Sequence, residues 1–253
     1  MKSKDEAENA AVAPHPRLDP YYEDERGRRR FVRDIFDETA PDYERIIRLM
    51  SFGSGDWYRR DALRRAQVRE GMHVLDVAVG TGPVASAALA LVGPTGSVTG
   101  LDPSFGMLAQ TRRRLPIPLV QGIAERLPFA DASFDFLSMG YALRHVADLK
   151  GTFEEYRRVL RPGATALILD FRKPSTALGR RLVRIYLGTL VPFVARLAAR
   201  SDKADLLMHY CWDTVHRCVP PETIVASMEA GGFRGVTTET YFGVFGEYKA
   251  SAA

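Results

Sequence analysis

The sequence predicts an α/β protein with a doubly wound, mostly parallel sheet, and three observations support this. The apolar segment 73–79 runs into the turn Gly80–Gly82, and a helix starts at Pro83, as at the opening of a nucleotide-binding α/β domain. Short apolar segments then alternate with helical patterns as far as Asp170. Acidic residues or glycine stand at the ends of these segments, where such sheets bind their ligands.

Length and composition favour one globular domain and exclude several other classes of protein. The chain has 253 residues, of which 46% are hydrophobic, and this suits a single α/β domain with insertions. Its formal net charge of +4 is too small to require a nucleic-acid partner. Cys211 and Cys218 are expected to be buried, reduced thiols, as in a reducing compartment. Because the start is polar and no apolar run could span a bilayer, we expect a cytoplasmic protein.

The segments before the first strand are predicted to be a tail and a helical cover. Residues 1–22 are polar and rich in proline, which predicts a disordered or loosely attached tail ahead of a single domain over 23–253. Because the helical segments that follow precede the first strand, we expect them to cover the mouth of the ligand site. Apolar spacing predicts three of them, from Phe31, over 42–50 after Pro41, and over 57–66.

The alternating part of the chain is predicted as strands and helices in a regular order. Ser104 is the expected N-cap of the second helix, because its hydroxyl can accept a hydrogen bond from a free backbone N–H. The turn Gly93–Gly96 separates the first helix from the second strand. In chain order, the predicted elements are a strand over 74–79, a helix over 83–92, a strand over 98–102, a helix over 104–114, strands over 118–121 and 134–139, a helix over 149–160 and a strand over 164–170.

The pattern after the last of these strands predicts a helical lid and a closing hairpin. Residues 178–199 form an apolar helical pattern that Pro192 is expected to kink or split. Together with a helix over 202–217, they are interpreted as a lid at about 177–218, and contact with a membrane surface is the alternative. A last helix from Pro221 and an antiparallel hairpin complete the predicted fold.

The glycine turn and the acids near it predict S-adenosylmethionine as the cofactor. The dinucleotide pattern G-x-G-x-x-G and the P-loop pattern are both absent after Gly80. Asp102 stands at the tip of the next strand, about 20 residues on, where an acid holds the ribose hydroxyls of an adenosine. Asp76 lies within the first strand, where a carboxylate is costly unless it faces the turn or a cationic ligand. An adenosine without phosphates, beside acidic groups, suggests S-adenosylmethionine, whose sulfonium is positive.

Several motifs keep the order and spacing of one enzyme family. They are Val32–Tyr43, Leu49–Gly53, Val74–Gly82, Ala124–Phe129, Phe134-Asp135, Ala142–Val146, Tyr156–Gly163 and Leu169–Pro174. On these motifs the chain, from about Phe31 to Phe233, resembles the ubiquinone/menaquinone biosynthesis C-methyltransferase family, within the class I S-adenosylmethionine-dependent methyltransferases. The resemblance implies a Rossmann-like, seven-stranded sheet whose last strand is antiparallel.

The resemblance also implies where the cofactor binds. Gly80, Thr81 and Gly82 would approach its methionine and ribose parts, and Asp102 would hold the ribose hydroxyls. Ile123 and Ala124 occupy the adenine-side positions. No metal site is predicted. The complete predicted cofactor site is Asp76, Ala78, Gly80, Thr81, Gly82, Asp102, Pro103, Met107, Ile123, Ala124 and Gly140.

Some positions depart from the family pattern, mostly on the substrate side. Ile123 stands where family members usually have a polar residue, and Gly140 stands where they often have serine. His145 replaces asparagine in the family's Leu-Arg-Asn-Val, and the segment 54–60 differs from the family's His-Arg-x-Trp-Lys region. The cofactor half therefore fits more closely than the substrate half. We predict a small aromatic, quinol-like or enolic acceptor, methylated on carbon in preference to oxygen.

Three residues are predicted to act on this acceptor. His145 is the candidate general base, because the ordinary pKa of histidine lies near neutrality. Arg144 would stabilise a phenolate electrostatically. Tyr43, from the helical cover, would orient the ring. Since methyl transfer is an in-line displacement, positioning and the exclusion of water should provide most of the acceleration.

Two other functions were weighed against methylation of a small molecule. A nucleic-acid methyltransferase usually carries an Asp/Asn-Pro-Pro-aromatic run after the fourth strand, and here that place reads Met139-Gly-Tyr-Ala-Leu143. We therefore expect no nucleic-acid partner. A cofactor-binding protein with a non-methylating or partner role stays open, because fold does not determine function. Weak peripheral membrane contact and a homodimer also stay open as partners.

Overall fold

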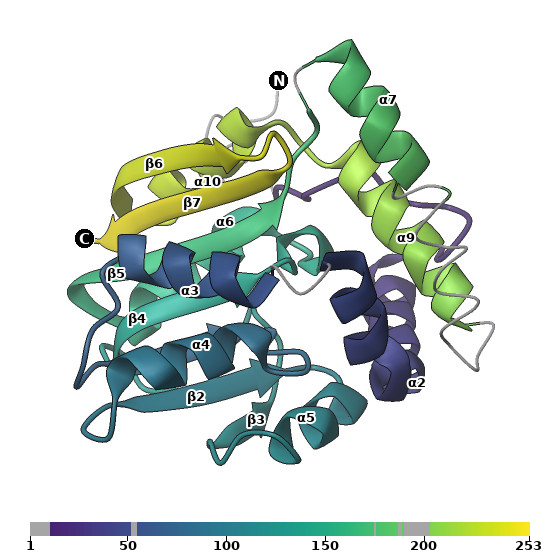
Figure 1. Cartoon of the computed structure of the whole chain (residues 1–253). Coiled ribbons are helices and arrows are strands. Elements are labelled where there is room, and N and C mark those ends of the chain that lie inside the picture. The colour runs from purple at the N-terminus through teal and green to yellow at the C-terminus, as the bar shows by residue number, and fades with distance from the viewer. Residues whose placement is uncertain (1–10, 52–54, 175, 187–188, 190–202) are drawn as a thin grey trace.

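A single seven-stranded sheet forms the centre of the protein (Figure 1). The computed structural model describes residues 11–51, 55–174, 176–186, 189 and 203–253. The strand order is β3-β2-β1-β4-β5-β7-β6. The strands are β1 (His73–Val77), β2 (Ser97–Asp102), β3 (Leu119–Gln121), β4 (Phe134–Gly140), β5 (Leu160–Phe171), β6 (Phe233–Tyr241) and β7 (Phe245–Ala252).

The direction of the strands confirms the predicted fold class. β3, β2, β1, β4 and β5 are parallel, whereas β7 is antiparallel to both β5 and β6. The chain builds outward from β1 to β3 and then returns to place β4 on the other side of β1. Ligands of such sheets bind where the strand order reverses, at the carboxyl ends of β1 and β4.

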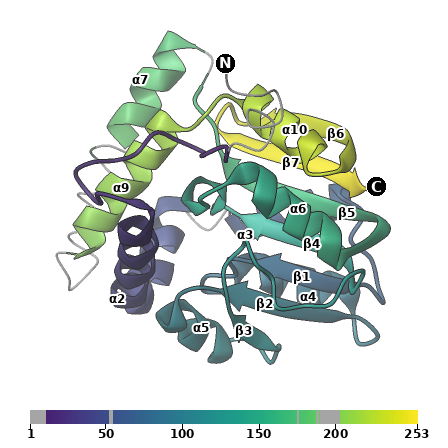
Figure 2. The ribbon, with the colours of Figure 1, turned by 180° about the vertical axis from the view of Figure 1, so that it is seen from behind.

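Helices cover both faces of the sheet. On one face, α4 (Pro83–Val92) packs on β1 and β2, and α3 (Gly55–Arg65) lies beside it, over the part of the sheet nearer β5 and β7 (Figure 1). Small apolar side chains fill most of the contact between these helices and the sheet. On the other face, seen in Figure 2, α6 (Leu149–Val159) and α10 (Pro221–Ala230) bury larger side chains. The helix α5 (Phe105–Arg112) lies beside β3 at one edge. Among the described residues, no helix is long and apolar enough to cross a bilayer.

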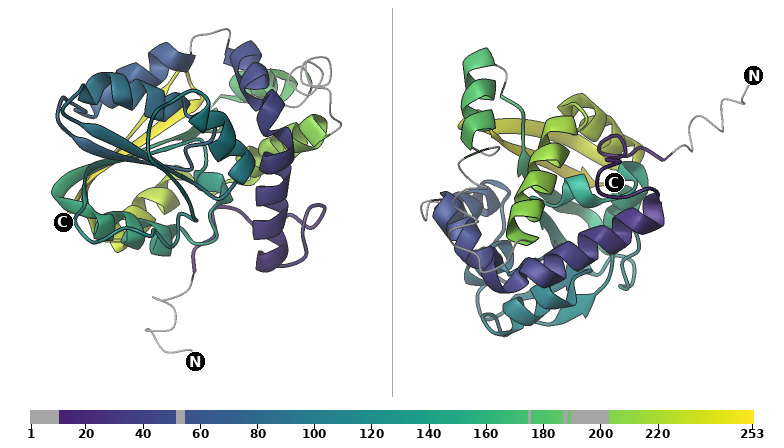
Figure 3. Two further views of the ribbon diagram at one scale, coloured as in Figure 1. Left: turned by 90° about the horizontal axis from the view of Figure 1, so that it is seen from below. Right: turned by 90° about the vertical axis from the view of Figure 1, so that its right-hand side faces the viewer.

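A separate group of helices lies beyond the carboxyl ends of the parallel strands. It consists of α2 (Glu25–Ser51), α7 (Ala177–Ile185) and α9 (Lys203–Arg217), which face the viewer in the right-hand view of Figure 3. These helices are the predicted N-terminal cover and inserted lid. The expected kink at Pro192 lies outside the described residues.

The segment before α2 is packed, unlike the loosely attached tail that its composition predicts. Of that tail, residues 1–10 lie outside the described residues. Leu18 and Tyr22 are buried against α2 and α9. Val12 exchanges hydrogen bonds with the start of α6, and the carbonyl of Pro14 accepts a bond from Val219. Since α6, α9 and Val219 are more than 100 residues away in the sequence, the local composition could not indicate them.

Pro41 lies inside one continuous helix, α2, and does not start a separate helix as predicted. Because proline lacks an N–H, the carbonyl of Asp37 loses its helical partner at this point. Gly106 packs against that carbonyl, and a Cβ at position 106 would lie 2.7 Å from its oxygen. The carboxylate of Asp37 also accepts hydrogen bonds from Gly106 N and Ser104 Oγ. Ser104 is the N-cap of α5, as predicted. The helix α2 therefore docks on the start of α5 at the point where one of its backbone hydrogen bonds is missing.

Candidate active site

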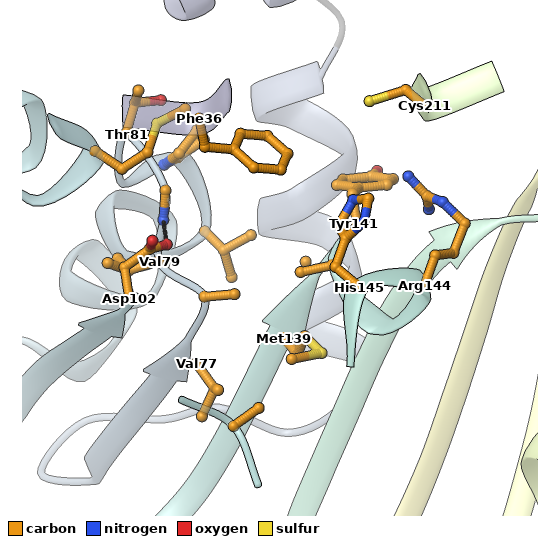
Figure 4. A pocket seen from close by; sticks show the side chains of 18 of the residues that line it. Phe36, Val77, Val79, Thr81, Asp102, Met139, Tyr141, Arg144, His145 and Cys211 are labelled. Atoms are coloured by element: carbon orange, nitrogen blue, oxygen red, sulfur yellow. Dashed lines mark hydrogen bonds between the residues drawn. The ribbon is translucent and has the colours of Figure 1, made fainter. Parts of the chain in front are cut away.

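One cavity of about 590 Å³ opens at the carboxyl ends of β1, β2 and β4 (Figure 4). Its volume is within the usual range for small-molecule sites. All of the predicted catalytic residues and all but one of the predicted cofactor residues line it. The exception is Gly82, which precedes α4 with φ +87°, and whose added Cβ would lie 2.8 Å from a methyl of Leu115. Gly82 therefore permits the turn and does not face the cavity.

Asp102 holds the glycine turn in place. Its carboxylate accepts hydrogen bonds of 2.8 Å from Gly80 N and from Ser104 N. Burial raises the pKa of Asp102 to about 6, although these donors oppose the shift. Gly80 has φ +56°, and an added Cβ there would come no closer than 4.0 Å to Ala78 O. The backbone of the turn is thus open to a ligand beside a carboxylate.

Asp76 is the buried acid at the base of the cavity. Its Oδ1 accepts a 2.7 Å hydrogen bond from Ser138 Oγ, whereas Oδ2 has no hydrogen-bond partner among the described residues. Burial raises the pKa of Asp76 to about 7, against the opposing effects of Ser138 and of the backbone N–H of Ala85. A buried carboxylate oxygen without a donor fits a cationic group. Asp76, Asp102 and the open turn together fit S-adenosylmethionine, with its positive charge and its ribose hydroxyls.

The helix α2 is fastened to the turn by a second acid. Thr81 Oγ1 donates a 2.8 Å hydrogen bond to Glu44 Oε2, and Arg114 Nη1 lies 2.7 Å from the same oxygen. Tyr43, the neighbour of Glu44, lines the cavity and packs edge-on against Phe36. The cover is therefore built against the cofactor loop, which places Tyr43 over the predicted position of the acceptor.

His145 lies between aromatic rings at the far side of the cavity (Figure 4). Its ring stacks on Tyr210 at 5.4 Å and meets Phe36 edge-on at 5.4 Å. Its Nδ1 is 3.2 Å from the hydroxyl of Tyr210. Burial, followed by the positive charge of Arg144, holds the pKa of His145 well below its usual value. The imidazole is therefore neutral at physiological pH.

Arg144 is committed to an internal ion pair. Its guanidinium pairs with the buried carboxylate of Asp170, and its Nε donates a 3.3 Å hydrogen bond to Thr214 Oγ1. It also lies over the ring of Phe171, 5.6 Å from the centroid. These contacts join the loop after β4 to β5 and α9. The neutralising carboxylate weakens the predicted action of Arg144 on a phenolate.

Several aromatic residues of the cavity were missed in the sequence. Tyr141 comes directly after β4 and Phe171 is the last residue of β5, and their ring centroids lie 5.0 Å apart. Tyr141 has φ +62°, an uncommon conformation for a bulky residue, which holds its ring at the cavity wall. Tyr58 and Phe245 reach the cavity from α3 and the final hairpin. The strand-end rule could have found the first two residues, but no local signal brings the other segments together.

Two departures from the family pattern have structural counterparts. Ile123 and Ala124 line the cavity, so an apolar side chain is placed on the adenine side. At Gly140, an added Cβ would lie 2.8 Å from Val84 Cγ2. Val84 therefore occupies the room that the side chain of serine would need.

Comparison with known proteins identifies the family. The profile of the ubiE/COQ5 methyltransferase family matches residues 23–249. The chain belongs to this family. It is 34% identical over 208 residues to the ubiquinone/menaquinone biosynthesis C-methyltransferase UbiE of Hahella chejuensis, covering 79% of this chain and 82% of that one. It is 35% identical to the demethylmenaquinone methyltransferase of Chlorobaculum tepidum, covering 80% and 84%.

A solved structure supports the same fold. The SAM dependent methyltransferase from Aquifex aeolicus superimposes with a TM-score of 0.61 at 17% identity, covering 83% of this chain and 98% of that one. This ubiE/COQ5 family member is thus an enzyme, a methyltransferase that uses S-adenosylmethionine. Asp76, Asp102 and the turn at Gly80 are the residues that would hold the cofactor.

Proposed function

We propose that this ubiE/COQ5 family member methylates a ring carbon of a small quinol-like acceptor. The names of its relatives, a ubiquinone/menaquinone biosynthesis C-methyltransferase and a demethylmenaquinone methyltransferase, support this acceptor class. The observation that carries the proposal is the continuity of one cavity. It joins the glycine turn and Asp76 at one end to the rings of Phe36, Tyr43 and Tyr141 at the other. A flat ring between these walls lies next to the cofactor and away from water.

The residues of the cavity position the acceptor and receive a proton. S-adenosylmethionine, when bound, supplies the methyl group. Tyr43 and Phe36 hold the ring from the side of α2, and Tyr141 holds it from the end of β4. His145, neutral at physiological pH, accepts the proton that the acceptor must lose. This role needs the tautomer in which Nδ1–H donates to the hydroxyl of Tyr210, leaving the Nε2 lone pair free.

The decisive experiment uses 1,4-naphthalenediol that carries deuterium on the ring carbons beside its hydroxyl groups. With S-adenosylmethionine and the enzyme, methylation on carbon removes one deuterium from the product, whereas methylation on oxygen retains it. Mass spectrometry distinguishes the two. The oxidised naphthoquinone is the matched control and should not react, because its ring carbons are electrophilic. Cofactor binding without a methylated product from a panel of quinols would favour the non-methylating alternative.

Replacing His145 by Ala is expected to lower kcat and leave cofactor affinity unchanged. Attack by a ring carbon precedes loss of the ring proton, so the reduction should be roughly 10- to 100-fold, at the low end of general-base effects. Because the pKa of His145 lies well below its usual value, kcat of the wild type should stay level on acidification to below about pH 6.5. Single-turnover rates and calorimetry with S-adenosylmethionine check this. An unchanged kcat would remove His145 from the mechanism.

The rim of the cavity predicts an acceptor with an apolar substituent. Trp57 and Phe242 line the cavity and are nevertheless 62% and 75% exposed. Replacing both by Ala should raise KM roughly tenfold for a naphthalenediol with a geranyl substituent, since about 1.4 kcal/mol of apolar contact is lost. KM for the unsubstituted diol should not change. An equal rise for both acceptors would contradict a role in binding the substituent. Weak contact of the lid segment 178–199 with a membrane stays a prediction.

A further inference from the structure

Arg59 is a buried cation in the wall of the cavity. It comes from α3, is only 7% exposed and lines the cavity beside Tyr141, with Cζ 5.8 Å from the centroid of that ring. Gly55 makes room for its guanidinium, since an added Cβ there would lie 2.8 Å from Arg59 Nη1. The structure therefore places a positive charge, with little access to water, at the aromatic end of the site.

Among the described residues, Arg59 forms no ion pair with a buried carboxylate. Its carboxylate partner is Asp56 Oδ1, 3.1 Å from Nη1, and the side chain of Asp56 is 89% exposed. Such an exposed partner is screened by water and contributes little. A buried cation with so weak a partner is costly, unless a ligand completes its environment.

The other buried arginines of the cavity have their partners within the protein. Arg144 is paired with the buried carboxylate of Asp170. Arg28 is paired with Glu25 and donates to the carbonyl of His145. Both cations are therefore occupied in holding the fold. By comparison, Arg59 is the buried arginine whose charge is available to a ligand.

The charge of Arg59 acts on groups at both ends of the site. Burial raises the pKa of Tyr43, Tyr141 and Asp76, and the positive charge of Arg59 opposes that rise in all three. These groups belong to the cover, the end of β4 and the cofactor end. A ring oxygen near Arg59 would leave the neighbouring ring carbon facing the cofactor end.

We propose that Arg59 binds the ionised ring oxygen of the acceptor, so that the enzyme selects a phenolate. This inference rests on the proposed function. Loss of the hydroxyl proton gives the ring an electron pair to share with its neighbouring carbon. That carbon forms the new bond to the methyl group, the carbon–sulfur bond breaks, and S-adenosylhomocysteine leaves. The ring then loses its C–H proton to His145, and the oxygen takes back a proton from water, which received the hydroxyl proton on ionisation. No oxidant or reductant is needed.

The test uses 4-nitrophenol, whose ionised and neutral forms absorb at different wavelengths, with S-adenosylhomocysteine present and no methyl donor. The wild type should bind the phenolate about tenfold or more tightly than the neutral phenol, as a charge-assisted contact provides. Arg59→Gln should abolish this preference, and Arg59→Lys should restore part of it. Arg60→Gln, on the exposed side of the same helix, is the matched control and should retain it.

The outcomes separate this inference from the proposed function. If Arg59→Gln keeps the wild-type preference for the phenolate, while calorimetry shows the usual affinity for S-adenosylhomocysteine, the inference is wrong. Loss of preference in Arg59→Gln alone supports it, because the assay contains no methyl donor. Failure to methylate any quinol bears instead on the proposed function. If Arg59→Gln no longer binds S-adenosylhomocysteine, the test is repeated with Arg59→Met. That variant is judged by the same two measurements, its preference for the phenolate and its affinity for S-adenosylhomocysteine.

Discussion

Asp76→Asn is expected to weaken S-adenosylmethionine binding about 100-fold, because one charged contact with the cofactor is lost. The same substitution is expected to stabilise the free protein at neutral pH. Asp76 is 1% exposed, and its Oδ2 has no donor among the described residues. A cationic ligand would supply the missing counter-charge. The asparagine can still accept the hydrogen bond from Ser138, but it carries no charge for the cofactor.

The gain in stability follows from the pKa of Asp76. Burial raises that pKa from 3.8 to about 7, which corresponds to a free-energy cost on the order of 4 kcal/mol for the ionised carboxylate. Between about pH 4 and pH 7 the folded protein holds a proton that the unfolded chain has lost, so stability falls as pH rises. Asparagine does not titrate, and its buried amide costs about 1–3 kcal/mol. A net gain of about 1–3 kcal/mol is expected at pH 8, and none near pH 4.

Two measurements check the prediction for Asp76. Urea unfolding of both proteins at pH 8 and at pH 4.5 gives the difference in stability. Calorimetry with S-adenosylmethionine between pH 5 and pH 8 gives the affinity. In the wild type the affinity should rise with pH to about 7, because binding requires the ionised carboxylate. In Asp76→Asn this dependence should be reduced. A less stable variant with unchanged affinity would show that Asp76 serves the fold alone.

Local patterns were sufficient to predict the sheet and to place the candidate cofactor residues at the carboxyl ends of its strands. The strand before Gly80 and the acids Asp76 and Asp102 lie in one continuous stretch. Their predicted roles follow from short apolar strands, a glycine turn and the rule that ligands bind at strand ends. Ser104 as N-cap of α5 was predicted on the same local basis and is confirmed.

The remaining features depend on contacts between distant segments. The continuity of α2 through Pro41 depends on docking against Gly106, which no helix rule includes. The packing of residues 11–22 depends on α6 and α9. The buried state of Arg59 depends on how α3 meets Tyr141. Each of these joins parts of the chain that local sequence patterns treat separately.

Arg144 lies in the predicted site, but its charge is paired inside the protein and not left free for the acceptor. The sequence predicts that it acts on the acceptor, and it does line the cavity. In the structure its charge is paired with Asp170, 26 positions later, at the end of β5. The catalytic role of Arg144 stays a prediction. A variant that removes the pair without unfolding the protein can test it.

Arg144→Met is therefore expected to lower the free energy of unfolding by about 3–5 kcal/mol, as the loss of one partner leaves the other charge buried and alone. From the part of the chain that the structure describes, the carboxylate of Asp170 would then keep one hydrogen bond, from Phe171 N. Arg144→Met with Asp170→Leu removes both charges and fills the space with apolar atoms. This double variant should regain most of the stability, because replacing a buried ion pair by well-packed apolar residues is often neutral.

The double variant then separates structure from catalysis. Urea unfolding of the wild type, both single variants and the double variant gives the coupling energy of the pair. If Arg144 serves the fold, the refolded double variant should keep its preference for the phenolate of 4-nitrophenol and a kcat within a few-fold of the wild type. A stable double variant with a kcat lowered about 100-fold would return Arg144 to the chemistry as an electrostatic stabiliser, and Arg59 would then not be the sole cation acting on the acceptor.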